Sequence, residues 1–312
     1  MTGLSRRLFR AADSLDQRPP RALFRWLLLV ACVAAGNPSA DAGAPPWREH
    51  KLPSPHLGTS GFITVRVPAG FTASQTARYP VLYLLPVGTK REEATIALRA
   101  LEQSAVADRF IVVMPWFDTT PWYANHRDDS QRQHERHLLE VVIPFIDQNY
   151  PTFSSAAGRS LLGFSKSGWG AFSLIFRHPG LFGFAASWDA PLGLRDAEYG
   201  IWGTAAQTGS LEHFHTFHPW HLMEQHAEIF RDRAPRLVLA GSALFGPGPH
   251  DHYADAPHTE TTHARLEALR IPHRYLPDLH YKHAWSSGWL GAVADALLEL
   301  QEYPPDASPP RM

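Results

Sequence analysis

Cysteine, excess charge of either sign and long apolar runs are all scarce in this sequence. The chain of 312 residues holds a single cysteine, Cys32, so no disulfide can form within it. Lys and Arg together number 29 against 30 for Asp and Glu, and no basic stripe interleaved with aromatic residues is present. A nucleic-acid partner is therefore not expected.

The apolar run at residues 26–35 is too short to cross a bilayer as a helix, but it suits the core of a signal peptide. An arginine-rich stretch precedes it, and the Leu-Val-Ala-Cys sequence that ends at Cys32 resembles a bacterial lipobox. Residues 1–36 are therefore predicted to be a signal peptide or a lipoprotein signal and anchor. The protein is expected to be exported, and to be periplasmic or membrane-anchored by lipidation of Cys32. Ordinary cleavage near residues 40–42, a short membrane anchor that is not cleaved, and a buried helix in a cytoplasmic protein are the alternatives.

The rest of the chain divides into three parts. Residues 37–57, rich in Ala, Pro and Gly, are expected to be a linker, residues 58–303 a single folded domain and residues 304–312 a disordered tail. Within the domain, apolar segments of strand length alternate with segments of helical periodicity. The expected strands are residues 61–67, 79–85, 110–114, 182–188, 236–240 and 273–276, with a further strand before Gly163, and the expected helices include 91–106, 131–149, 259–269 and 289–300.

This alternation predicts an α/β fold with a mostly parallel central sheet and helices on both faces. Residues 190–224, long and rich in Trp, Tyr and His, are expected to form an irregular cap. In such folds the loops at the carboxyl ends of the strands build the functional site.

The most informative motif is Gly163-x-Ser165-x-Ser167-Gly168, which follows Leu161 and Leu162 and precedes a helical pattern. A strand, a small-residue turn and a helix in this order are typical of a nucleophile elbow, which exposes one serine hydroxyl above the sheet. Ser165 is therefore the candidate nucleophile. Ser167 stands where glycine is usual. A flexible turn without catalytic function is the alternative.

A serine nucleophile needs a histidine base that is oriented by an acid. His283 lies after the last expected strand and is the preferred base, with His280 in reserve. The acid is expected in the loop after residues 236–240, where Asp251 is preferred and Asp255 is the alternative. Both carboxylates could instead cap the following helix.

Two backbone N–H groups should hold the oxyanion of an acyl-transfer reaction. One is expected from Lys166 and the other from Val87 or Gly88, since Pro86 has no N–H, and Val87 is preferred.

Trp116, Trp122 and Trp188 fall at strand ends or in loops near the expected site and are predicted to contact substrate, although they could instead fill the core. His250-x-His252, with Asp251 and Asp255 nearby, could instead hold a metal, but it lacks the full ligand spacing of a known zinc motif. Acyl transfer by a serine requires neither a metal nor an organic cofactor, and none is expected.

With these motifs in place, the sequence resembles the putative-esterase family of α/β-hydrolases, which includes esterase D, feruloyl and acetylxylan esterases and mycolyltransferases. The resemblance rests mainly on residues 163–171, on Arg177-His178-Pro179 and on His283-Ala284-Trp285. It implies that Ser165 is the nucleophile and His283 the base. Residues 85–88 and 241–251 depart from the family's usual oxyanion and acid motifs.

The expected function is hydrolysis of small-molecule or carbohydrate esters through an acyl-enzyme intermediate. An acyltransferase of the same fold, or a surface-anchored binding protein on a degenerate hydrolase scaffold, is the alternative.

Overall fold

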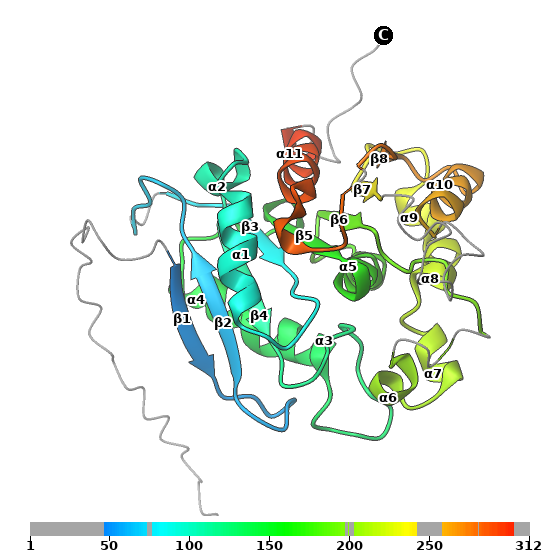
Figure 1. The fold of residues 1–312 in the computed structure, drawn as a ribbon, viewed down its shortest axis with the longest axis horizontal. Coiled ribbons are helices and arrows are strands. Elements are labelled where there is room, and N and C mark those ends of the chain that lie inside the picture. The colour runs from blue at the N-terminus through cyan, green and yellow to red at the C-terminus, as the bar shows by residue number, and fades with distance from the viewer. Residues whose placement is uncertain are drawn as a thin grey trace, which may run out of the picture. The chain divides into compact units, whose positions relative to one another are not determined.

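The structure is a computed structural model, and it describes residues 47–73, 77–196, 199, 203–241, 258–279 and 281–302. Eight strands form one sheet in the order β1-β2-β4-β3-β5-β6-β7-β8 (Figure 1). Their bounds are β1 Trp47–Leu52, β2 Gly61–Arg66, β3 Val81–Leu84, β4 Ile111–Trp116, β5 Arg159–Phe164, β6 Phe184–Trp188, β7 Leu237–Ala240 and β8 His273–Leu276. The strands β4, β3, β5, β6, β7 and β8 run parallel, whereas β1 and β2 are antiparallel additions at one edge. The predicted mostly parallel sheet is thus confirmed.

Helices cover both faces of this sheet, as predicted (Figure 1). The α-helices are α1 Glu92–Leu101, α2 Val106–Arg109, α3 His134–His137, α4 Ile143–Asn149, α5 Ser165–Arg177, α6 Thr204–Thr208, α7 Leu211–His215, α8 Pro219–Gln225, α9 Ala227–Phe230, α10 His258–Ala268 and α11 Trp289–Glu302. A π-helical segment, η1 Leu138–Val142, joins α3 to α4, and the short 3₁₀ turns are η2 Ala156–Gly158 and η6 Trp285–Ser287.

The period-2 alternation of each strand divides the apolar core into two halves. In β3, for example, Val81 and Tyr83 pack with η1, α4 and α5, whereas Leu82 and Leu84 pack with α1 and α11 on the other face. All four side chains are fully buried. This two-sided burial explains why the central strands are nearly continuous in apolar residues.

Residues 47–52 differ from the prediction, because they lie in the expected linker and form strand β1 instead. Arg48, Glu49 and Lys51 of this strand are exposed, so it has no apolar alternation by which to recognise it. Its stability comes from antiparallel pairing with β2, in which Trp47 lies opposite Arg66. Charged side chains on an edge strand also disfavour pairing with another chain.

The cap region also differs from the prediction of irregular structure. Short helices α6, α7 and α8 occupy much of it (Figure 1). The Ser210 side chain caps α7 by accepting the His213 backbone N–H, and α8 begins at Pro219, a favoured first helical residue. Among the described residues, no helix combines the length and apolar composition needed to cross a membrane.

Candidate active site

Ser165 lies at the junction of β5 and α5, at the turn that the elbow motif predicts. It is the first residue of α5 and has a φ of 53°, in the left-handed region that non-glycine residues rarely adopt. The preceding residue, Phe164, is still extended. This abrupt change of backbone direction is the geometry of a nucleophile elbow, and its strain is typical of a functional site.

The small residues Gly163, Ser167 and Gly168 around Ser165 have different structural roles. A Cβ on Gly163 would lie 2.4 Å from the Ser167 carbonyl oxygen, and one on Gly168 would lie 2.6 Å from Ser187 Oγ on β6. Ser167, which replaces the usual glycine, uses its hydroxyl to accept the Phe164 N–H at 3.1 Å and to donate to the Phe164 carbonyl at 2.9 Å. The serine therefore stabilises the bend, and Gly168 provides the close approach to the sheet.

His283 lies in the loop between β8 and α11, and its ring packs against Phe164, the residue before Ser165, with 5.0 Å between ring centroids. Its Nδ1 lies 2.8 Å from Oδ2 of Asp189. Because an ionised carboxylate only accepts, Nδ1 donates and Nε2 of the neutral ring keeps its lone pair. The base predicted from sequence is thus held in the tautomer that a general base requires.

Asp189, which bonds His283, was not among the acids predicted from the sequence. It directly follows β6, is 1% exposed, and has a φ of 49°. Strands β5 and β6 pair so that Phe164 lies opposite Trp188, and Ser165 and Asp189 are therefore the next residues on neighbouring strands. An aspartate directly after a buried strand was the available signal, but the register that brings it beside Ser165 cannot be seen in the sequence.

A pocket of about 560 Å³ opens at this point of the fold. Ser165, Lys166, His283 and Val87 line it, so four of the predicted site residues meet there. Its other lining residues include Gly88, Glu93, Phe164 and Trp285.

Val87 and Gly88, in the loop after β3, line the pocket together with Ser165. The Tyr123 hydroxyl donates to the Pro86 carbonyl at 2.9 Å. In a trans peptide C=O and N–H point in opposite directions, so this bond directs the Val87 N–H away from Tyr123. Gly88 lies beside the Glu93 carboxyl, which favours Val87 over Gly88 as the predicted donor.

Two charged side chains line the same pocket. Burial raises the pKa of the Glu93 carboxyl, while hydrogen bonds from Trp285 and Gly88 oppose this effect. Burial lowers the pKa of the Lys166 amine, whose nitrogen lies 5.9 Å from the ring centroid of Trp122. The pocket thus offers an acidic and a basic group close to the reacting serine.

The three tryptophans predicted to contact substrate are buried instead and do not line the pocket. Trp116 donates to Thr64 Oγ1 at 3.1 Å within the core. Trp122 packs edge-on against Trp169, and Trp188 stacks on Trp289 with 4.5 Å between ring centroids. Trp122 belongs to the half of the core that packs with α5, whereas Trp116 and Trp188 belong to the half that packs with α1 and α11. Trp285, which was not proposed, lines the pocket.

Several predicted residues lie outside the described part of the chain. They are Cys32, His250, Asp251, His252, Asp255 and His280, together with residues 1–36 and 304–312.

Comparison with known proteins adds to this geometry. Residues 54–234 match the family described as Putative esterase. The chain belongs to the putative esterase family. The matched region of this family member contains Ser165 and Asp189, whereas His283 lies beyond it. The family resemblance expected from the sequence is thus confirmed.

Two curated relatives of this esterase-family chain come from Mycobacterium tuberculosis. Esterase Rv1288 (strain H37Rv) and Esterase MT1326 (strain CDC 1551) are each 29% identical to it over 142 residues, which is 45% of this chain. The match covers 31% of the length of each relative.

Solved structures share the fold of this family member at low identity. M. tuberculosis MPT51 (FbpC1) aligns with a TM-score of 0.63 and 18% identity over 82% of this chain and 99% of that one. An S-formylglutathione hydrolase from Agrobacterium tumefaciens gives a TM-score of 0.62 and 13% identity over 83% of this chain and 94% of that one. The serine hydrolase FphF of Staphylococcus aureus aligns with a TM-score of 0.60 and 15% identity over 82% of this chain and 98% of that one. The predicted α/β-hydrolase fold is confirmed.

Proposed function

We propose that this protein is a serine hydrolase that cleaves carboxylic esters of small molecules or carbohydrates through an acyl-enzyme intermediate. The observation that carries the proposal is the hydrogen bond between Asp189 and His283, whose ring packs beside the strained Ser165 turn. In this proposal Ser165 is the nucleophile, His283 the general base and Asp189 the orienting acid. The order Ser, acid, His along the chain is that of α/β-hydrolases.

The reaction proceeds in two steps. Ser165 Oγ attacks the ester carbonyl carbon while His283 Nε2 takes the hydroxyl proton. The backbone N–H groups of Lys166 and Val87 hold the resulting oxyanion; the Lys166 N–H is free to do so because it belongs to the first turn of α5. The carbon–oxygen bond to the alcohol then breaks, and His283 returns its proton to the leaving alkoxide. Water, deprotonated by the same histidine, hydrolyses the acyl-enzyme.

The proposal is tested with p-nitrophenyl acetate and p-nitrophenyl butyrate as substrates. Ser165→Ala should lower kcat by at least about 10³-fold, because the covalent route is lost. A Ser173→Ala variant is the matched control, since it removes a buried hydroxyl from α5 away from the pocket. Labelling by a fluorophosphonate probe should disappear only in Ser165→Ala. Equal hydrolysis by wild type and Ser165→Ala, at the same folded concentration, would reject the assignment.

Acyl transfer to a sugar or lipid acceptor is the second candidate, and the structural likeness to MPT51 (FbpC1) is too distant to favour it. The same acyl-enzyme would form, and the acceptor alcohol would replace water. Product analysis with a competing alcohol distinguishes the two activities. A degenerate binding scaffold predicts neither hydrolysis nor labelling.

Export and lipidation of Cys32 remain part of this proposal, and they rest on the arginine-rich start, the apolar run at residues 26–35 and the lipobox-like sequence. Mass spectrometry of the protein from a bacterial membrane fraction should find an acylated amino-terminal Cys32. A Cys32→Ala variant should lack that modification. Recovery of the unprocessed chain from the cytosol would contradict export.

A further inference from the structure

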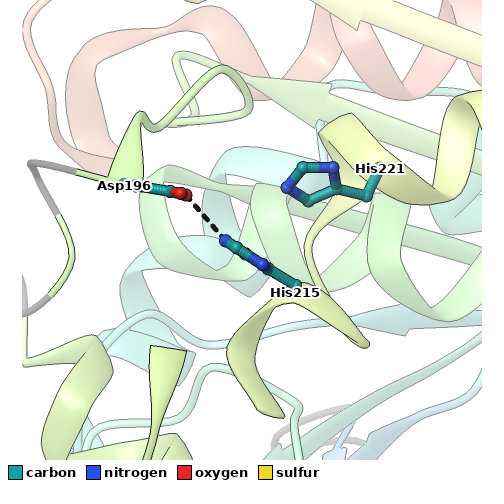
Figure 2. Close-up of side chains that lie close together, drawn as sticks. All are labelled: Asp196, His215 and His221. Atoms are coloured by element: carbon teal, nitrogen blue, oxygen red, sulfur yellow. Dashed lines mark hydrogen bonds and ion pairs between the residues drawn. The ribbon is translucent and has the colours of Figure 1, made fainter. Parts of the chain in front are cut away.

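Three side chains in the cap form a cluster that the proposed mechanism does not use: Asp196, His215 and His221 (Figure 2). One ligand atom from each lies within 4.8 Å of the others. His215 Nε2 is 2.6 Å from Asp196 Oδ1, and the rings of His215 and His221 have centroids 4.5 Å apart. The Asp196–His215 pair alone could be an ordinary hydrogen bond, but it does not explain why a second imidazole faces the first.

The three residues come from separate segments of the chain. Asp196 follows β6 in the segment that begins with Asp189, His215 ends α7, and His221 lies in the first turn of α8. Two imidazole nitrogens and one carboxylate oxygen converge in the way that Figure 2 shows. This donor set is one that Zn²⁺ and related transition metals bind readily.

The backbone behind the cluster is fixed by a buried histidine, His218, which is 1% exposed. Its Nδ1 lies 3.2 Å from Trp169 Nε1 of α5, and its Nε2 lies 2.8 Å from the carbonyl of Leu194. An indole N–H can only donate and a carbonyl can only accept, so Nδ1 is the acceptor and Nε2–H the donor. His218 therefore ties the start of α8 and the segment before Asp196 to α5.

A second contact fixes the remaining segment. Phe214, next to His215, stacks on Trp169 with 5.6 Å between centroids and 12° between planes. Each of the three segments is thus anchored to α5 within three residues of its candidate ligand. Ligands on anchored backbone can converge on an ion without a large ordering cost.

The distances suit a small ion after minor side-chain rotation. Zn²⁺ binds nitrogen and oxygen at about 2.0–2.1 Å, so two ligand atoms of a tetrahedral site lie about 3.3 Å apart. The Asp196–His215 separation of 2.6 Å would have to open by about 0.7 Å, and the other separations, within 4.8 Å, can close. The Asp196 side chain is 62% exposed and that of His215 31%, so an ion has access from solvent.

We propose that Asp196, His215 and His221 bind one divalent transition-metal ion, with Zn²⁺ the best match, and that this ion holds α7 and α8 to the segment that follows Asp189. Three protein ligands leave a fourth position to water. None of the three residues lines the Ser165 pocket, so the ion acts on the cap rather than on the ester. Binding to the folded state alone raises its stability.

The test uses the full-length protein without a polyhistidine tag, after removal of metal by a chelator. Zn²⁺ is titrated by calorimetry and Co²⁺ by its visible absorption, each against wild type, Asp196→Asn, His215→Gln and His221→Gln. A nearby control, just beyond the end of α8, is His226→Gln, which removes an imidazole outside the cluster. A second control, His263→Gln, disrupts the other group of close metal-binding side chains in the described residues, His263, Glu267 and His273.

Wild type and both controls should bind one equivalent of metal, and each of the three cluster variants should bind at least tenfold more weakly. Zn²⁺ should raise the Tm of wild type but not that of His221→Gln. Circular dichroism and Tm in the metal-free state show that the variants are folded. The proposal is overturned if wild type binds no stoichiometric metal, if the cluster variants bind as tightly as wild type, or if His263→Gln alone abolishes binding.

Discussion

At the scale of single residues, Ser165 and Asp189 share a strained backbone conformation. Their φ angles are 53° and 49°, and each follows a parallel strand at the same level of the sheet. Non-glycine residues in this region cost of order 1–3 kcal/mol each. Both strained residues directly follow adjacent strands. This is consistent with selection for the positions of the Ser165 and Asp189 side chains rather than for the stability of the fold.

The role of Asp189 gives the first prediction at this scale. Asp189→Asn should lower kcat/KM for p-nitrophenyl butyrate by about 10³–10⁴-fold, because an amide can hold the imidazole in the wrong tautomer. Asp251→Asn and Asp255→Asn, the acids favoured by sequence, should remain within about threefold of wild type. A large loss in either of those two variants, with Asp189→Asn active, would move the acid to the loop after β7.

Tyr123 is a positioning residue in this scheme, because its hydroxyl orients the Pro86–Val87 peptide. Tyr123→Phe should lower kcat by about tenfold with little change in KM, since the oxyanion donor loses its orientation. Tyr150→Phe is the matched control, as its hydroxyl bonds His50 away from the pocket. A similar kcat for Tyr123→Phe and wild type would show that the loop holds its geometry without this bond.

Ser165, His283 and Lys166 could be proposed from the sequence because each stands beside a recognisable local pattern, and all three line one pocket. Asp189 could not be chosen, since several aspartates follow strands and only the register of β5 with β6 distinguishes them. The burial of Trp116, Trp122 and Trp188 could not be predicted for a related reason. Burial depends on which tertiary neighbours cover a strand end, and composition does not reveal those neighbours.

At the scale of elements, α3 carries two buried histidines, His134 and His137, which pack against Phe117. Burial lowers the pKa of His134 to about 3 and that of His137 to about 4, with neighbouring histidines adding to the effect. In the unfolded chain these two imidazoles take up protons near pH 6.5, whereas in the folded protein they stay neutral at that pH. Their contribution to the free energy of unfolding is therefore fully present above pH 6.5 and is lost as the pH decreases toward 4.

At pH 5 each of these histidines should cost about 2 kcal/mol of unfolding free energy relative to pH 7. Urea unfolding of wild type between pH 7 and pH 5 measures this loss. His134→Gln and His137→Gln should each show a shallower pH dependence, whatever their stability at pH 7. Parallel curves for all three proteins would contradict the proposed cause.

The helical run that contains Pro144 was predicted in extent but not in helix type. The sequence predicts one helix over residues 131–149, bent by Pro144. The structure has a continuous helical run whose middle, η1, is π-helical just before that proline. Proline lacks the N–H that would bond the carbonyl four residues earlier, and the wider turn accommodates this loss. The apolar face was predictable, whereas the change of helix type was not.

At the scale of the whole molecule, the sheet and its two half-cores followed from the alternation of buried strands and amphipathic helices. The edge was the part that could not be predicted, because β1 has the composition of a linker. This gives a prediction about truncation. A chain starting at Pro45 should retain the Tm and the esterase activity of the full-length protein, since it keeps every described strand.

A chain starting at Pro53 removes β1 and leaves the β2 edge unpaired. It should lose several degrees in Tm and aggregate more readily, because an unpaired edge strand invites pairing between chains. Differential scanning fluorimetry and light scattering compare the two truncations. Identical behaviour would mean that β1 contributes nothing to the fold.

The attachment of the acidic group to β6 has a consequence for divergence and engineering. In the proposed mechanism the nucleophile and the acid belong to adjacent strands, and none of its named groups comes from residues 242–257. We therefore expect that stretch to tolerate shortening, exchange or grafting from a relative, with altered substrate choice and retained turnover. A library randomised there should yield active clones at high frequency, whereas one randomised at residues 189–191 should yield almost none.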